Sequence, residues 1–294
     1  MEQSWKQAKA AFAIVVAPPT LWLLLFFLVP MAVIWGYSFG ENVGLTEIDL
    51  TGSFKNYARA IEPLYLGIFW KSIVTAAITT LLCLIVGFPV AMAIAFASPR
   101  TKAWLLLLIM LPFWTNLLIR TYALMAVLRT EGYINSTYHF FWNLIGLAPG
   151  GFEPLELLNN NFAVIFGLVY VHLPFMVLPL YSALDRMDRS LMEASLDLGA
   201  GHLRTIFAIV VPLAAPGIAS GVLITFIPAL GAYLTPDLLG GPDSQMIANV
   251  IERQFKRAND WPFGAALSFL LMYLTFFAIA AQGWVSRRAE KVGR

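Results

Sequence analysis

The segment of this chain best suited to specific chemistry is a short charged run between two long apolar stretches. Its acidic residues and its glycines predict a charged helix that is broken by glycine. A soluble partner could push on such a helix from one side of a membrane. The residues that carry this interpretation are Glu193, Ala194, Ser195, Asp197, Gly199 and Pro212.

Residue sets that perform catalytic or metal chemistry are missing from the sequence. The three histidines and the single cysteine are scattered, without the spacing of a metal site. No Gly-x-x-x-x-Gly-Lys-[Ser/Thr] segment is present, so we expect no nucleotide site on this chain. A membrane-embedded enzyme would need a nucleophile with its base, or a metal, within the apolar segments, and none is found. We therefore expect a chain that is not an enzyme, with no catalytic residues, metal site or bound cofactor.

Composition indicates that these residues are positioned by membrane helices. The chain is 59% apolar and 12% charged, against about 25% charged in a typical soluble domain. A bilayer core about 30 Å thick takes roughly 20 helical residues. We predict an all-α integral membrane protein with one transmembrane domain over 11–286. Its six spans cover about 12–38, 70–97, 103–128 (continuing past Arg120), 162–184, 206–230 and 263–285.

A further uncharged segment, 132–152, is not predicted to cross the membrane. It contains many polar groups, and Pro149 and the two glycines after it break helices, which does not suit a lipid-facing span. Its apolar residues between Phe140 and Leu147 fit a short helix that lies at the membrane interface. A seventh span would also reverse the orientation of everything that follows it.

The distribution of lysine and arginine predicts the orientation. The termini and the two short inner loops carry eleven of the 19 basic residues, and the much longer outer loops carry seven. This density bias satisfies the positive-inside rule. Acidic residues have the opposite bias, with eleven outside and six inside. Both termini, 1–10 and 287–294, and the loop 187–204 are therefore predicted to be cytoplasmic.

The loop 187–204 is predicted to contain a short helix. Ser190 and Glu193 have the spacing of a capping box, in which serine caps the helix and glutamate bonds back to it. One face of the helix would carry Met187, Leu191, Ala194 and Leu198, with Asp188, Arg189, Glu193 and Asp197 turned away from it. An ordinary amphipathic linker, in which Glu193 only caps its own helix, explains the spacing equally well.

The end of this helix and the start of the next are also predicted. Gly199-Ala200-Gly201 would end the first helix, because glycine readily adopts the left-handed cap conformation. A second helix would begin near Leu203 and enter the membrane. We expect it to bend at Pro212 and Pro216, because proline interrupts helical hydrogen bonding.

The same loop resembles the EAA motif of ABC importer permeases, which reads Glu-Ala-Ala, three residues, Gly, nine residues, Ile, one residue, Leu-Pro. The matching positions are Glu193, Ala194, Ser195, Gly199, Ile209 and Pro212. Ser195 replaces the second Ala and Val211 replaces Leu, both conservatively in size. In that family the loop forms a coupling helix that docks in a groove on the ATP-hydrolysing subunit. The resemblance implies polar contacts for Glu193, close approach at the two small residues and a turn at Gly199.

Four further segments resemble the spermidine/putrescine permeases of this family, and the likeness extends from about residue 20 to 285. They are 111–122 (LPFWTNLLIRTY), 173–181 (LPFMVLPLY), 238–244 (LLGGPDS) and 260–266 (DWPFGAA). The resemblance implies the type I ABC importer permease fold, with the last five helices forming the core and the first wrapping the partner. It implies residence in a bacterial inner membrane and import of polyamines.

The resemblance also implies a set of partners. They are a second, homologous permease, a dimer of the cytoplasmic ABC ATPase that binds the ATP, a periplasmic solute-binding protein and membrane lipid. No nucleic acid is expected among them. Rigid-body rocking of the helices, driven by the ATPase through the loop, would alternate access to a central cavity.

A polyamine is a flexible polycation, so its route should offer carboxylates, carbonyls or aromatic faces. The spans contain no deep Asp or Glu, and the candidates for contact are Glu41, Trp114, Tyr122, Tyr170, Tyr233 and Asp237. Each acid has the alternative role of solvating a loop or contacting the binding protein, and each aromatic that of anchoring or packing. Arg120 would repel a polycation, so we expect it to extend to headgroups or pair with an outer acid. His172 is expected to be a hydrogen-bonded core residue.

Two alternatives remain open at the level of the sequence. The same type of importer could carry another small cationic solute or an amino-acid-like solute. A secondary transporter would need no partner, but such proteins commonly have internal repeats and charges within the membrane. No repeat is visible in this sequence.

Overall fold

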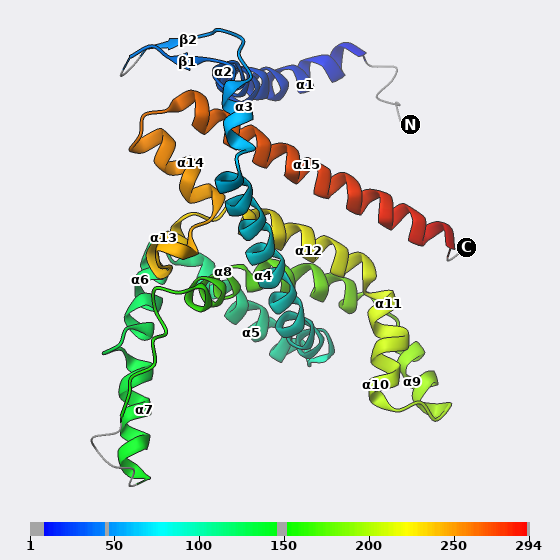
Figure 1. Cartoon of the computed structure of the whole chain (residues 1–294). Helices are drawn as coiled ribbons and strands as arrows, with labels where there is room; N and C mark the ends of the chain where they lie inside the picture. Colours follow the sequence, from blue (N-terminus) through cyan, green and yellow to red (C-terminus); the bar gives the residue numbers. More distant parts are fainter. Residues whose placement is uncertain (1–8, 45–46, 146–151, 293–294) are drawn as a thin grey trace. The chain divides into compact units, whose positions relative to one another are not determined.

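The computed structural model describes residues 9–44, 47–145 and 152–292 (Figure 1). Predictions for residues 1–8, for 146–151 within the proposed interfacial segment and for the last two residues lie outside this range. The chain forms two compact units, residues 1–65 with 251–273, and residues 66–250 with 274–294. Nearly all regular structure is helical, as predicted.

Four helices are long and apolar enough to cross a membrane. They cover Phe12–Tyr37, Pro63–Phe96, Asn161–Asp185 and Trp261–Gly283. Two bent helix pairs are also long and apolar enough if each pair is taken as one span. The described residues would then form up to six spans. The first pair is Pro99–Trp114 with Leu117–Leu144, and the second is His202–Leu213 with Ala215–Leu230.

The first unit contains the N-terminal helix and a small hairpin. The helix comprises α1 (Lys9–Leu23), a π-helical turn (Leu24–Leu28) and α2 (Val29–Tyr37). The most apolar part of this helix has no side chain buried within the described chain. An apolar surface of this kind must be covered by lipid or by another protein. The unit also contains β1 (Glu41–Asn42), β2 (Ile48–Asp49) and α3 (Lys55–Ala60).

The hairpin was not predicted from the sequence. Its strands have two residues each and pair antiparallel, with Glu41 opposite Asp49 and Asn42 opposite Ile48. Such short strands have no period-2 pattern that could be read from the chain. Side-chain hydrogen bonds fix the chain just before β1: Asn56 Nδ2 donates to the carbonyl oxygens of Ser38 and Gly40 at 3.1 and 2.8 Å.

The second unit is built around two helices that pack closely, α8 (Asn161–Asp185) and α12 (Ala215–Leu230), side by side in Figure 1. Gly217 and Gly221, one turn apart, let the backbones approach. A Cβ at Gly217 would lie 2.5 Å from the Ala183 Cβ, and one at Gly221 would lie 2.7 Å from the Met176 Sδ. This small-xxx-small spacing is typical of membrane helix pairs.

The described chain contains further helices and helical turns. They are α4 (Pro63–Phe96), α5 (Pro99–Met110), a 3-10 turn (Leu111–Trp114), α6 (Leu117–Leu128), α7 (Tyr133–Leu144), α9 (Ser190–Asp197), α10 (His202–Thr205), a π-helical turn (Ile206–Val210), α11 (Val211–Leu213), α13 (Leu234–Leu239), a 3-10 turn (Pro242–Ser244), α14 (Ile247–Lys256) and α15 (Trp261–Val292).

The segment predicted as a single third span is broken. The two arms meet at an angle of 97°, with Thr115 and Asn116 in extended conformation between them. Asn116 caps the second arm, because its Oδ1 accepts a hydrogen bond from the Leu118 N–H at 2.8 Å. Pro112, in the 3-10 turn, cannot donate a backbone hydrogen bond there. Pro112 and Asn116 are visible in the sequence, but the apolar residues on both sides led to the prediction of one continuous span.

The bend predicted at Pro212 and Pro216 is confirmed. The two arms make an angle of 70° and meet at Ala214, between the two prolines. The π-helical turn Ile206–Val210 ends two residues before Pro212, and the turn Leu24–Leu28 likewise ends two residues before Pro30. Since a proline ring displaces the carbonyl four residues earlier and removes a donor, the preceding turn widens.

Candidate functional site

The loop 187–204 folds into two short helices, α9 and α10, which adjoin α11 (Figure 1). Gly199 ends α9 as predicted, with φ of +83°. Its N–H donates to the Leu196 carbonyl at 2.9 Å, and the Ala200 N–H donates to the Ser195 carbonyl at 3.1 Å. These two bonds form a Schellman motif, which satisfies carbonyls at the helix end. The glycine therefore sets the angle at which the chain returns toward α10.

The capping box predicted at the start of α9 is wrong. Ser190 is the first helical residue, and the cap makes no side-chain bond of that kind. Asp188 performs this role, because its Oδ1 accepts a hydrogen bond from the Ser190 N–H at 3.0 Å. This bond and one from the Ser190 side chain hold the pKa of the Asp188 carboxyl below its ordinary value. No described residue is seen to hydrogen-bond the side chain of Glu193, which is exposed.

The face of α9 that packs against the chain also differs from the predicted apolar face. Met187 and Met192 pack on a buried cluster that includes Leu184 and Val210. Leu191 and Leu198, which were grouped with Met187, are 46% and 88% exposed. The loop thus presents leucine side chains, together with exposed Glu193, Ala194 and Asp197, to its surroundings.

Ser195 and Thr205 join the two helices of the loop. Their hydroxyl oxygens lie 3.0 Å apart, and Thr205 is only 2% exposed. Thr205 was not among the predicted residues, because its contact with Ser195 arises from the fold of the turn. Ser195, which departs from the alanine of the EAA motif, therefore has a hydrogen-bonding partner of its own.

The base of the loop is attached to the ends of neighbouring helices. Arg189 Nη2 donates to the Ala95 carbonyl at 3.0 Å, and its guanidinium carbon lies 5.3 Å from the centre of the Phe96 ring. Lys102 forms an ion pair with Asp185. The first contact attaches the start of α9 to the end of α4, and the ion pair joins α5 to the end of α8.

Beside the loop is a cavity of about 570 Å³. Pro179 and Ser182 of α8 line it together with Arg186, which follows α8, and so do Leu213 and Pro216 at the 70° bend. Met187, Asp188 and Leu191 of the loop also line it. The space lies where the two helices diverge at one end of their close contact.

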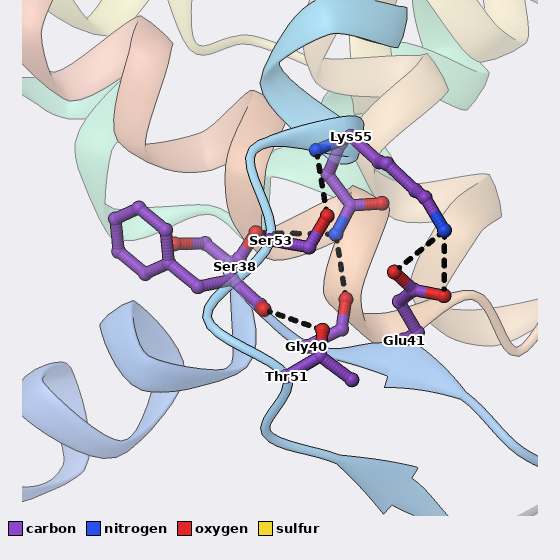
Figure 2. A network of polar contacts seen from close by, with 8 residues as sticks. Ser38, Gly40, Glu41, Thr51, Ser53 and Lys55 are labelled. Atoms are coloured by element: carbon purple, nitrogen blue, oxygen red, sulfur yellow. Dashed lines mark hydrogen bonds and ion pairs between the residues drawn. The ribbon is translucent and has the colours of Figure 1, made fainter.

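The acidic candidates for the substrate path lie in different settings. Glu41 forms an ion pair with Lys55, with Oε1 2.9 Å from Nζ (Figure 2). The hydrogen bond from Lys55 lowers the pKa of the Glu41 carboxyl, and burial opposes this only in part. This contact links the hairpin to α3. Asp237 lies on α13 and is exposed.

The aromatic candidates are partly exposed and are not gathered in one place. Trp114 is 76% exposed, Tyr122 50% and Tyr170 41%. Tyr233, 44% exposed, is the member of the set that lines a second cavity of about 330 Å³. That cavity is also lined by Arg120, His172 and Thr235. Nothing in the structure tests whether these residues contact a solute.

His172 has the core position expected of it. It is 5% exposed, and its Nδ1 lies 2.8 Å from the Leu168 carbonyl, so the proton resides on Nδ1. Within the described ranges, no group of three His, Cys, Asp or Glu side chains gathers as metal ligands would.

Comparison with known proteins gives consistent matches over nearly the whole chain. Residues 8–291 match the family described as binding-protein-dependent transport system inner membrane component. The chain is 41% identical over 270 residues to the spermidine/putrescine transport system permease protein PotB of Escherichia coli (strain K12), covering 92% of this chain and 96% of PotB. It is 37% identical over 273 residues to PotB of Haemophilus influenzae, covering 92% and 93%.

The fold matches a solved structure as well. A bacterial ABC transporter involved in the import of the acidic polysaccharide alginate superposes with a TM-score of 0.73, over 97% of this chain and 98% of the other. The sequence identity of the pair is 16%, so this match establishes the fold.

Proposed function

This chain belongs to the family of binding-protein-dependent transport system inner membrane components, and from this premise we propose how it works in a polyamine importer. It is a permease subunit of such an importer, with the all-α fold of type I ABC importer permeases. The observation that carries the function is the 41% identity to a spermidine/putrescine permease over 92% of the chain.

The proposed assembly contains two permeases, two copies of an ATPase and a periplasmic solute-binding protein. The sequence contains no nucleotide-binding motif, so the energy must be supplied by another chain. The unburied apolar helix Phe12–Tyr37 supports an extensive contact with a second permease or lipid. A related alginate importer has been solved with its periplasmic protein, which supports this kind of partner.

In the proposed mechanism, the ATPase dimer grips the loop 187–204. Glu193, Ala194, Ser195, Asp197 and Gly199 form the docking surface, and Glu193 supplies a carboxylate that its own chain does not use. Closure of the ATPase dimer on ATP would displace α9. The Ser195–Thr205 contact would carry the displacement into α10, and the Arg189–Ala95 contact would carry it into the end of α4.

The displacement would change the helix angle at the bend near Pro212. A helix broken at Ala214 can change its angle with less loss of hydrogen bonding than a continuous helix. The arm Ala215–Leu230 is packed on α8, so the two would move together as a rigid body. The cavity of about 570 Å³ beside the bend would change its width in this motion.

The proposed polyamine route runs past the partly exposed aromatic residues. Trp114, Tyr122, Tyr170 and Tyr233 offer ring faces to an alkylammonium group. Asp237 would attract it, and Glu41 would act at the outer surface while paired with Lys55. In this scheme the loop 187–204 and both termini lie in the cytoplasm, where ATP is available.

Uptake by the reconstituted complex tests the function. Proteoliposomes that contain this chain, its partner permease, the ATPase and the loaded binding protein should accumulate labelled putrescine and spermidine when ATP is supplied. The purified chain alone should neither hydrolyse ATP nor drive uptake. Uptake by the chain without an ATPase would refute the proposal, and strong competition by an amino acid but none by a polyamine would reassign the cargo.

A further inference from the structure

A short non-helical segment separates α12, which ends at Leu230, from α13. We call this segment, Gly231, Ala232 and Tyr233, the break. All three of its residues line the second cavity, of about 330 Å³. Tyr233 is 44% exposed, so part of it is accessible to a solute. Because a helix that ends leaves its last carbonyls without helical partners, other groups must fix the position of such a segment.

One buried amide attaches the break to the start of α14. Asn249 Nδ2 donates to the Tyr233 carbonyl oxygen at 2.7 Å, and Asn249 Oδ1 accepts a hydrogen bond from the Met246 N–H at 3.1 Å. Asn249 is 2% exposed. Met246 directly precedes α14 and Asn249 is the third residue of that helix, so the second bond is the half of a capping box in which residue N3 bonds back to the N-cap. The side chain therefore caps one helix and also holds a carbonyl of another segment.

The capped end of α14 is itself fixed by two neighbouring helices. The Ile247 N–H donates to Ser72 Oγ of α4 at 2.8 Å, and Ser72 is fully buried. Met246 packs with Leu168 of α8 in a buried cluster, and Ala232 of the break packs against the same cluster. Buried polar groups that are paired in this way favour a single arrangement, because a shift would leave a donor or an acceptor without a partner. Asn249 thus connects the break to a firmly held part of the chain.

The Tyr233 carbonyl has two partners with different roles. Besides the Asn249 amide, it accepts a hydrogen bond from the Asp237 N–H at 3.0 Å, within the first turn of α13. A carbonyl oxygen has two lone pairs, so both can be used. The bond from Asp237 forms the turn, whereas the bond from Asn249 sets where that turn lies relative to α14. Loss of the Asn249 amide would leave α13 formed and would allow the break to shift.

From these contacts we propose that Asn249 is a positioning residue for polyamine import, which holds Tyr233 where a passing solute meets it. Because Arg120 lines the same cavity, a polycation would contact the exposed part of Tyr233, away from the guanidinium. Attraction between an ammonium group and an aromatic ring extends only to about 6 Å from the ring centre. A small shift of the break would therefore weaken the contact. This inference rests on the proposed function, in which Tyr233 lies on the polyamine route.

The amount of spermidine taken up per ATP hydrolysed tests this role, because the ratio does not depend on how much of the complex has folded. It is measured with labelled spermidine in proteoliposomes that contain the complete importer and the loaded binding protein. Asn249→Ala should lower the ratio about tenfold. Asn249→Asp keeps an acceptor for the Met246 N–H but offers no amide donor to Tyr233, so it should lower the ratio as well. The second variant decides the matter if Asn249→Ala does not assemble.

Asn135→Ala is the matched control. Asn135 is also 2% exposed, and its amide donates to the Leu155 carbonyl at 3.0 Å and accepts from the Leu155 N–H at 2.8 Å. Neither residue lines the second cavity. Asn135→Ala should therefore lower the melting temperature of the protein but leave the ratio at the wild-type value.

A double variant shows whether Asn249 acts through Tyr233. Tyr233→Ala should lower the ratio to a similar extent, and Asn249→Ala added to it should lower the ratio no further. Additive losses, a wild-type ratio in the Asn249 variants, or an equal loss in Asn135→Ala would overturn the inference. In each of these cases the proposed function stands if the wild-type complex imports polyamine. Absence of ATP-driven polyamine uptake by the wild-type complex would instead refute the proposed function.

Discussion

At the scale of single residues, Glu193 differs from Asp188 because its side chain makes no hydrogen bond that caps α9. Asp188 accepts the hydrogen bond at the start of α9, and Glu193 is exposed without a described partner for its side chain. We predict that Glu193→Ala leaves membrane insertion intact but lowers co-purification of the ATPase. Losing one partner of a charged interface contact costs roughly 2–5 kcal/mol.

Quantitative blotting of the ATPase recovered with the tagged permease measures this effect. The matched control is Glu131→Ala, which removes an equally exposed acid on the predicted outer side. Equal recovery for Glu193→Ala and wild type, with coupled uptake preserved, would remove Glu193 from the docking surface. Equal losses in both variants would point to a nonspecific charge effect.

Ser195 and Thr205 provide a second prediction at this scale. Removing either hydroxyl leaves the other without its partner, and Thr205 is almost fully buried. We expect Ser195→Ala and Thr205→Val each to destabilise the loop locally by about 1 kcal/mol. The double variant should cost less than the sum of the two, because the shared contact is lost only once.

Hydrogen exchange of the amides in 190–205 reports the local stability. The amides of α8, which lie outside the altered loop, serve as the internal reference. Strictly additive effects would show that the 3.0 Å separation of the two hydroxyls carries no coupling energy.

At the scale of elements, the contact between α8 and α12 depends on the absence of side chains at two glycines. A Cβ at Gly217 would lie 2.5 Å from the Ala183 Cβ and 3.0 Å from the Pro179 carbonyl oxygen. We predict that Gly217→Val separates the helices and destabilises the protein by roughly 1–3 kcal/mol. Gly36→Val is the control, since a Cβ at Gly36 meets nothing within 4 Å.

Thermal unfolding of the purified protein in detergent measures both variants. The melting temperature should fall for Gly217→Val and stay close to wild type for Gly36→Val. A similar melting temperature in the two variants would mean that α8 and α12 can separate without loss, and that their close approach is not required for stability.

The elements show how far local signals determine structure. The ends marked by Gly199 and by Pro212 with Pro216 were predicted correctly, because each residue restricts its own backbone. The cap at Asp188 was missed, because Ser190 and Glu193 also matched a known pattern. The break at Asn116 was hidden by apolar flanks that satisfy a hydropathy criterion whether or not the helix is straight.

At the scale of the whole molecule, composition alone indicated a polytopic membrane protein, and periodicity gave little more. The substrate path could not be predicted, because a tyrosine in an apolar helix is equally suited to packing, anchoring or lining. In the structure Trp114 is 76% exposed and Tyr233 lines a cavity, so the candidates lie in different surroundings. Thr205 and Asn249 gain their significance only from residues brought close by folding.

The orientation of the whole chain is the last prediction, and cysteine labelling tests it. The single cysteine, Cys83, is fully buried, and Cys83→Ala gives a background without thiols. Glu131→Cys and Arg204→Cys then place exposed thiols on either side of the span formed by α8. A membrane-impermeant maleimide should label Glu131→Cys in intact spheroplasts and should label Arg204→Cys only after permeabilisation.

The same pair of sites tests whether the segment 132–152 crosses the membrane. One span between positions 131 and 204 places them on opposite sides, whereas two spans would place them on the same side. Labelling of both thiols in intact spheroplasts would therefore mean that 132–152 crosses the bilayer. Labelling of Arg204→Cys alone in intact spheroplasts would mean that the orientation is opposite to the predicted one. The loop 187–204 would then face the periplasm, where no ATPase could reach Glu193.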